Sequence, residues 1–224
     1  MTRLLMLVEG QSEEAFVKQT LAPWLAACGV FVQGPIVLWT KRLPAGGGHR
    51  GGVGSWEQVR KSLAPLLRDG DAWVTTLLDF YGLPDDLPGF AECKGQGTAH
   101  EQVTNVQAEM AGAFEHRPRF LPFLALHELE AWMFAEPAIV SAHFGSPAIA
   151  ARLAAEIPNQ GGPEDINHGP TSHPSVRLSR HCPSYKKTSD GPTVLAKIGI
   201  PAIRARCPHF DGWLARLEAL GARA

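Results

Sequence analysis

The sequence predicts an α/β fold in which helices flank a largely parallel sheet. Apolar runs with the composition of strands, at 3–8, 72–78 and 119–127, alternate with segments that carry helical capping signals. Such alternation is typical of βαβ units, whose successive strands run parallel. The later sequence turns helical and loop-rich. We therefore expect a core over 1–137 and a C-terminal extension over 138–224 packed on it.

The N-terminal elements follow from short local signals. Residues 3–8 are an apolar run of the length of a buried strand. A helix is expected over about 13–27, with Ser12 as its N-cap. A second strand over 30–38 follows, interrupted by a glycine and a proline. These elements form the first strand–helix–strand unit.

The next elements repeat this order. Residues 41–54 form a glycine-rich loop, which ends where Ser55 begins the pattern of a capping box. That pattern predicts a helix over about 56–68. The strand over 72–78 is rich in β-forming residues and ends at Asp79.

A third strand and its neighbouring helices complete the expected core. Thr98 begins a second capping box, which predicts a helix reaching about residue 114. The strand over 119–127 contains Pro122, so we expect it at an edge of the sheet or at a bulge. A helix is expected to run from Glu128 to about Phe134.

The extension divides into an irregular part and a helical part. Residues 158–177 contain so many prolines and glycines that no regular structure is expected there. Residues 211–221 are amphipathic and predict a final helix that ends at Gly221.

Composition and charge narrow the class of protein. Of the 224 residues, 45% are hydrophobic and 19% charged, as in an ordinary soluble globular protein, and no apolar run approaches the ~20 residues of a membrane span. Four scattered cysteines and no signal-peptide pattern favour reduced thiols and a cytoplasmic location. A net charge of -1 argues against a strongly basic protein that binds nucleic acid without sequence preference, although acids gather in 71–101 and bases in 173–210.

Carboxylates follow the predicted strands at the point where each strand ends. Glu9 follows the first strand, Asp79 a later one, and Glu128 and Glu130 the last. Ligands bind at the carboxyl ends of strands in open parallel sheets, so these acids predict a site for Mg²⁺ or Mn²⁺. The alternative is structural, because each acid alone can begin a helix or belong to a turn. The sequence leaves open whether Glu128 and Glu130 share the face of a strand or diverge on a helix.

A basic segment near the C-terminus predicts a phosphate-binding surface. Arg177, Lys186 and Lys187 carry its charge, and Tyr185 beside them is a candidate to stack on a nucleic-acid base. Arg50, in the glycine-rich loop, is a further candidate for contact with an anionic substrate. The alternative is that these segments are solvated loops without a ligand.

Several motifs resemble known families. VEGQSEE, at 8–14, is similar to the first signature of the TOPRIM fold of topoisomerases, bacterial primases and OLD (overcoming lysogenisation defect) nucleases, and Glu9-x-x-x-Glu13 matches the E-x-x-x-E form of the OLD group. The second TOPRIM signature, D-x-D, is represented by Asp79-Phe80-Tyr81, in which Tyr81 replaces the second acid. Together with DFYGLP, HELEAW, PSVRL, YKK and CPHF, the first motif resembles domain-of-unknown-function family 4276, a bacterial group of TOPRIM-like proteins.

The resemblance implies a TOPRIM-like, Rossmann-like fold and a nuclease that cuts DNA or RNA phosphodiesters with Mg²⁺ or Mn²⁺. By that resemblance Glu9 would be a metal ligand or general base, Asp79 a metal ligand, and Glu13 with Glu128 or Glu130 would complete the site. From the basic segment itself, Lys187 is expected to face a metal-bound phosphoryl group as a catalytic cation. Members of the family are often encoded beside ABC-type or OLD-like ATPases, which implies a partner ATPase and a role in defence against phage. The alternative is a TOPRIM-derived binding or regulatory subunit that has lost catalysis, which the replacement at Tyr81 favours.

Overall fold

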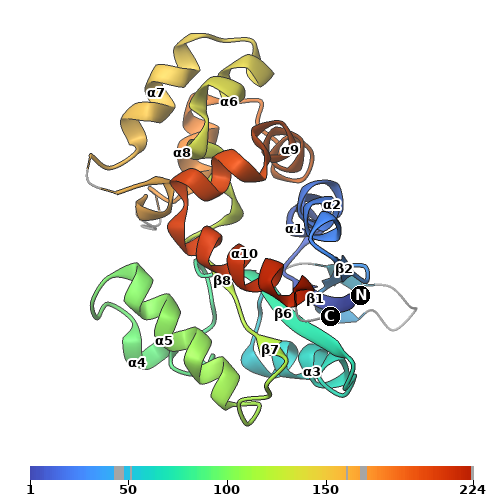
Figure 1. The fold of residues 1–224 in the computed structure, drawn as a ribbon. Coiled ribbons are helices and arrows are strands. Elements are labelled where there is room, and N and C mark those ends of the chain that lie inside the picture. Colours follow the sequence, from blue (N-terminus) through green and yellow to red (C-terminus); the bar gives the residue numbers. More distant parts are fainter. Residues whose placement is uncertain (43–47, 51, 160, 167–170, 223–224) are drawn as a thin grey trace.

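The computed structural model describes residues 1–42, 48–50, 52–159, 161–166 and 171–222, with a six-stranded sheet at the centre (Figure 1). Its strands are β1 (Thr2–Val8), β2 (Val30–Val32), β3 (Ile36–Val37), β6 (Ala72–Asp79), β7 (Phe120–Leu121) and β8 (Leu124–Ala125). The order is β2-β1-β6-β7, with β3 also paired to β1 and β8 to β6, and every pairing is parallel. The prediction of an α/β fold with a largely parallel sheet is confirmed.

The stretch predicted to be a glycine-rich loop contains a short antiparallel ribbon. In it β4 (Trp39–Arg42) pairs with β5 (Gly48–Arg50), and Trp39 lies opposite Arg50. The prediction of a loop over this whole stretch was wrong at these residues, because its glycines obscured two short segments able to pair. Residues 43–47 and 51 lie outside the described part of the chain.

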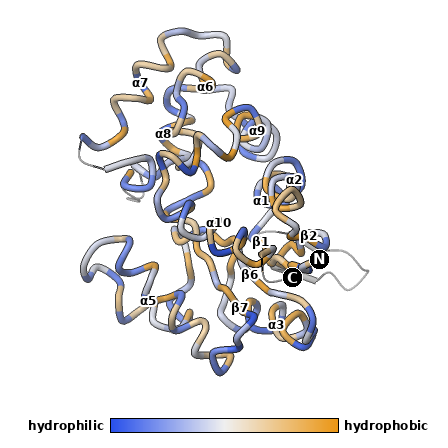
Figure 2. Tube along the Cα trace, in the orientation of Figure 1, coloured by the Kyte–Doolittle hydropathy of each residue, from blue (hydrophilic) through white to orange (hydrophobic). Residues whose placement is uncertain are grey.

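Helices cover both faces of the sheet because side chains alternate along its central strands. In β1, Leu4 and Met6 belong to one buried cluster and Leu7 to the other. The cluster with Leu7 includes residues of α3 (Trp56–Leu66) and α5 (Ala99–Gly112); the other includes residues of α1 (Gln11–Phe16), its π-helical continuation η1 (Val17–Leu21) and α2 (Ala22–Ala27). Figure 2 shows the resulting pattern, with hydrophobic residues along β6 and β7.

The C-terminal part is helical, as expected, and packs on the face of the sheet that α1, η1 and α2 also cover. Trp213 stacks on Phe123 with ring centroids 4.1 Å apart and an interplanar angle of 6°, and its indole Nε1–H donates to Thr75 Oγ1 at 3.0 Å. One buried cluster therefore contains residues from both sides of position 137, where the division of the chain remains a prediction. The remaining helices are α4 (Phe90–Cys93), η2 (Leu129–Ala135), α6 (Pro137–Phe144), α7 (Ala148–Glu156), η3 (Pro163–Asp165), α8 (Pro174–His181), α9 (Lys187–Arg206) and α10 (Pro208–Gly221).

Two local predictions were wrong at their boundaries. Gly10, not Ser12, is the N-cap of α1, and the Ser12 hydroxyl instead donates to the carbonyl of Lys187 at 3.3 Å. The stretch 158–177 was expected to be irregular, but η3 lies within it and α8 begins there at Pro174. Proline is compatible with the first turn of a helix, where its missing N–H has no helical partner to lose.

The third predicted strand is divided at Pro122 into β7 and β8, at the edge of the sheet as expected. Threonine hydroxyls of β6 take over the backbone contacts at the break. Thr76 Oγ1 accepts from the Phe123 N–H at 2.8 Å and donates to the Phe123 carbonyl at 2.6 Å, while the Thr75 hydroxyl donates to the Leu121 carbonyl at 2.6 Å. These bonds fix the path of the chain into β8 and towards the residues that follow it.

We expect Thr76→Val to lower the free energy of unfolding by about 1–3 kcal/mol, because it leaves the buried N–H and carbonyl of Phe123 without their partner. Urea titration followed by circular dichroism measures this difference. Thr104→Val is the matched control, since that hydroxyl lies on the exposed side of α5 and bonds only within the helix. An equal, small effect of both substitutions would contradict the role given to Thr76.

Candidate metal centre

Acidic side chains from three strand ends meet at one edge of the sheet. Glu9 follows β1 directly, Asp79 is the last residue of β6, and Glu128 lies three residues beyond the end of β8. Because β1 and β6 are adjacent and in register, the Asp79 backbone N–H donates to Glu9 Oε2 at 2.9 Å. Within the described residues, Asp79, Glu128 and Glu130 each offer a carboxylate oxygen, and these oxygens lie within 4.8 Å of one another.

A left-handed residue brings the last two acids into this group. His127 has φ of 66°, uncommon for a residue with a side chain, and the Tyr81 N–H donates to its carbonyl at 2.9 Å. Glu128 is then extended and occupies the N-cap position of η2, while Glu130 lies in the first turn of that 3-10 helix. The Leu129 N–H donates to Asp79 Oδ1 at 3.0 Å, which ties this turn to the end of β6. Glu128 and Glu130 therefore neither share the face of a strand nor diverge on one helix, because only Glu130 lies within η2.

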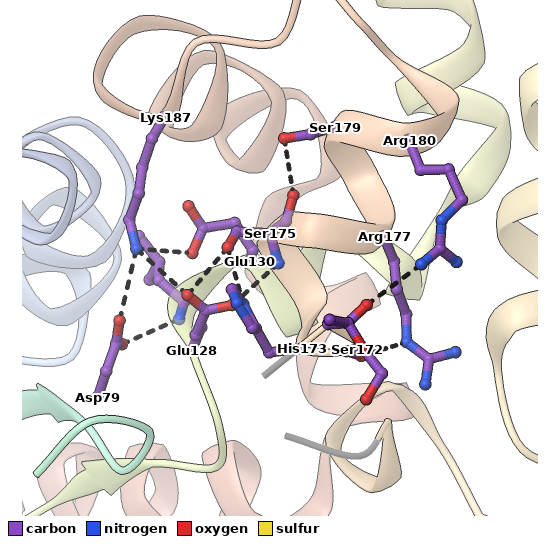
Figure 3. Close-up of polar contacts among 12 residues, drawn as sticks. Asp79, Glu128, Glu130, Ser172, His173, Ser175, Arg177, Ser179, Arg180 and Lys187 are labelled. Carbon is purple, nitrogen blue, oxygen red and sulfur yellow. Dashed lines mark hydrogen bonds and ion pairs between the residues drawn. The ribbon is translucent and has the colours of Figure 1, made fainter. Parts of the chain in front are cut away.

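Lys187 is the cation among these acids. It is the first residue of α9, and its Nζ lies 3.1 Å from Glu130 Oε2, 3.6 Å from Asp79 Oδ2 and 3.7 Å from Glu128 Oε1. Figure 3 shows its side chain descending towards Asp79 and Glu128. About 42% of the side chain is exposed, so this ammonium also borders solvent.

Residues at the start of α8 and in the segment after it hold Glu128 and Glu130 in place. Glu128 Oε2 accepts from the Ser175 N–H at 2.9 Å and lies 3.0 Å from His173 Nδ1, and the Ser175 hydroxyl donates to Glu128 Oε1 at 3.0 Å (Figure 3). The Tyr185 hydroxyl donates to Glu130 Oε1 at 3.0 Å. Tyr185 was expected to stack on a base, and in the structure its hydroxyl is directed to the acidic group.

Burial and mutual repulsion shift the ionisation of the whole group. Burial, with the nearby charge of Glu13, raises the pKa of Glu9 to about 7. Burial likewise raises the pKa of Glu13 and Glu130, and that of Asp79 well above its usual range, against the opposing effect of Lys187. Burial alone would lower the pKa of Lys187, but the carboxylates, Asp79 first among them, raise it above its usual value. The group therefore holds more acid than its own ammonium can neutralise.

A pocket of about 280 Å³ opens on the side of this group that Glu9, Glu13, Asp79 and Lys187 form. It lies between the turn that follows β1, the end of β6 and the first turn of α9. Its lining residues are Glu9, Gly10, Gln11, Ser12, Glu13, Gly52, Asp79, Lys187 and Thr188.

Of the other predicted substrate-binding residues, Arg177 is engaged away from these acids. Arg177 pairs with Glu156 of α7, with Nη1 2.5 Å from Glu156 Oε2, and Arg180 and His181 contact the same carboxylate. Lys186 is exposed beside the first turn of α9. Arg50 ends β5, and its side chain lies outside what the structure describes. The structure thus brings together Glu9, Glu13, Asp79, Glu128, Glu130, Tyr185 and Lys187.

His173 and Ser175 are site residues that the sequence reasoning missed. Both lie in the stretch 158–177, which was expected to be irregular. Pro174 between them was the available signal, because proline is favoured at the first position of a helix and the N–H groups of a first turn have no partner within the helix. Here that N–H belongs to Ser175 and its acceptor is Glu128.

The fold and site define an α/β protein with an oxygen-donor centre at the carboxyl edge of a parallel sheet. Domain of unknown function (DUF4276) matches residues 8–218, and the chain belongs to this family. The C-terminal region of the Burkholderia pseudomallei OLD protein is similar in structure, with a TM-score of 0.45 and 15% identity over 99% of this chain and 99% of that chain. No match was found among curated proteins. Within the described residues, no helix is both long and apolar enough to cross a membrane.

We expect Lys187→Met to lower the free energy of unfolding more at pH 8 than at pH 5. The pKa values of Asp79 and Glu130 are already raised in the folded protein, and removing the ammonium raises them further. Folded acids with raised pKa values lose stability as pH rises, because ionisation is then easier in the unfolded chain. Thermal unfolding at both pH values tests this, with the exposed Lys61→Met as control. Equal losses at the two pH values would refute it.

Proposed function

We propose that the chain is a Mg²⁺- or Mn²⁺-dependent nuclease that hydrolyses phosphodiesters of DNA or RNA. The observation that carries the proposal is the convergence of Asp79, Glu128 and Glu130 within 4.8 Å, beside a pocket and with Lys187 as the one ammonium that contacts all three within the described residues. A cluster of this composition is suited to a cation and, through that cation, to a phosphate.

The donor set fits a hard divalent ion. All the clustered donors are carboxylate oxygens, which Mg²⁺ and Mn²⁺ prefer. Glu13 Oε1 is buried and has no hydrogen-bond partner among the described residues, so the group has acceptor capacity that the chain leaves unused. Asp79, Glu128 and Glu130 would hold the ion, with Glu9 and Glu13 as further donors. Bound there, the ion would neutralise charge on a phosphoryl group and make a coordinated water more acidic.

The chain's own residues would perform the remaining tasks. Lys187, partly exposed at the pocket, would donate to a non-bridging phosphate oxygen. Glu9 binds the Asp79 N–H through Oε2, which leaves Oε1 to accept a proton if Glu9 acts as general base. Lys186 and Arg50 are proposed contacts for the nucleic-acid backbone. Arg177 pairs with Glu156, and the Tyr185 hydroxyl bonds to Glu130. We therefore propose that these two residues support the site.

The biological setting is proposed from the family resemblance. In that proposal the nuclease is cytoplasmic and is the effector of an anti-phage pair whose second member is an ABC-type or OLD-like ATPase. The ATPase would control access of nucleic acid to the pocket. This chain lacks the G-x-x-x-x-G-K-[ST] pattern, so nucleotide hydrolysis is assigned to the partner.

A second candidate is a nucleic-acid-binding or regulatory subunit without catalysis. The position of Lys187 favours it, because an ammonium 3.1–3.7 Å from three carboxylates partly neutralises the group without a metal. Tyr81, in place of the second acid of a D-x-D pair, favours it also. The two candidates differ in whether phosphodiesters are cut.

We expect the purified protein to cut supercoiled DNA, single-stranded DNA or structured RNA only when Mg²⁺ or Mn²⁺ is present. Glu9→Gln and Asp79→Asn should each reduce the cleavage rate roughly 100-fold or more, as expected for groups that stabilise charge at a reacting phosphate. Glu92→Gln and Asp71→Asn are matched controls on exposed acids and should leave the rate unchanged.

The assay is repeated with the proposed partner ATPase. Absence of cleavage under both conditions, in protein that binds Mn²⁺, would replace the nuclease proposal with the regulatory one. Cleavage that Asp79→Asn does not affect would show that another site or a contaminant is responsible.

A further inference from the structure

Tyr81 and His173 form a stacked pair beside the acidic group. Their ring centroids are 4.5 Å apart with an interplanar angle of 23°. Tyr81 lies two residues after Asp79, and its N–H is bonded to the His127 carbonyl, so its backbone position is fixed by the end of β6. The tyrosine therefore offers an aromatic face at the place where the sequence pattern led us to expect a carboxylate.

His173, which stacks on Tyr81, also contacts Glu128. Its Nδ1 lies 3.0 Å from Glu128 Oε2 and 3.1 Å from Ser175 Oγ, and only about 15% of its side chain is exposed. Ser175 adds its N–H to the same oxygen and its hydroxyl to Oε1. Glu128 is thus held through both oxygens, and its Oε1 remains directed towards Lys187 at 3.7 Å.

We propose that Tyr81, His173 and Ser175 are positioning residues that orient Glu128 as a ligand for the divalent ion. The proposal rests on the metal site proposed above and adds to it the reason for Tyr81. A carboxylate is a good ligand only when its orientation is fixed, and hydrogen bonds from neighbouring groups commonly provide this. Instead of supplying a further charged ligand, Tyr81 stabilises the imidazole that holds an existing one. The site would then have its ion held by three oriented carboxylates, with Lys187 as the second cation.

The geometry favours this role over direct catalysis by His173. Its Nδ1 faces Glu128 and Ser175, both of which belong to the chain, so this nitrogen is engaged before any substrate arrives. An ionised Glu128 can only accept in this contact, so the proposed role requires the tautomer in which Nδ1 carries the proton. Stacking on Tyr81 limits rotation of the ring about its side-chain bonds, and Ser175 holds the same carboxylate from the start of α8.

The test measures Mn²⁺ binding directly, by isothermal titration calorimetry on protein without nucleic acid. His173→Ala should weaken binding by about 10–100-fold, the range seen when groups that orient metal ligands are removed. His173→Asn should restore most of the affinity, because its side-chain amide keeps a donor near the position of Nδ1. Tyr81→Ala should weaken binding, whereas Tyr81→Phe keeps the aromatic face and should bind nearly as the unmodified chain does.

Two further measurements separate positioning from a general effect on folding. Thermal unfolding without metal shows whether each variant is folded at the temperature of the titration, and His116→Asn serves as an exposed histidine control. The ¹⁵N chemical shifts of the His173 ring in metal-free protein report whether Nδ1 carries the proton, and we expect it to do so. Loss of that signature in Tyr81→Ala, with the fold intact, would support the proposed role of the stack.

The outcomes for the two proposals differ. If the unmodified chain binds no Mn²⁺, the metal site itself is refuted, and the positioning role with it. If the unmodified chain binds Mn²⁺ and folded His173→Ala and Tyr81→Ala bind it equally well, the metal site stands and the positioning role is refuted. Failure of His173→Asn to restore binding would also count against the hydrogen bond as the cause.

Discussion

The burial of several carboxylates at one edge of the sheet is the constraint on which the rest of the arrangement depends. An ionised acid removed from water is strongly destabilising unless it gains hydrogen bonds or a counter-charge. Here the backbone N–H groups of Asp79 and Leu129, the hydroxyl of Tyr185 and the ammonium of Lys187 provide them. These donors come from the end of β6, from the start of η2 and from the segment that begins α9, so neutralising the acids also fixes how those three parts pack together.

The parallel direction of β1 and β6 could be predicted from the sequence, and with it the position of Glu9 and Asp79 at one edge of the sheet; the direct pairing of the two strands is known from the structure. Both acids come directly after long apolar runs, and strands that run parallel and adjacent must end at the same edge. The arrival of Glu128 could not be predicted in the same way. It depends on the left-handed conformation of His127. Histidine is enriched at positive φ among the non-glycine residues, but such conformations are still uncommon, so this preference does not predict one at a given position.

The groups that hold the acids were harder to predict, because they depend on tertiary packing. Ser175 reaches Glu128 over 47 positions of sequence, and Arg177, two residues later, is directed away to Glu156 on α7. The sequence showed that basic residues gather in this segment, but not which acid each of them contacts. Only the packing of α8 against η2 and α7 separates the role of Ser175 from that of Arg177.

The stacking of Trp213 on Phe123 joins the last helix to the break between β7 and β8, and this has a consequence for how the chain is inherited. The acids come from the first 130 residues, whereas Lys187, His173 and Ser175 come from the rest. A fragment, a gene fusion or a recombination that separated these halves would leave a negatively charged edge without its counter-ion. The two halves are therefore expected to be inherited together. A change of charge in one half is expected to require a compensating change in the other.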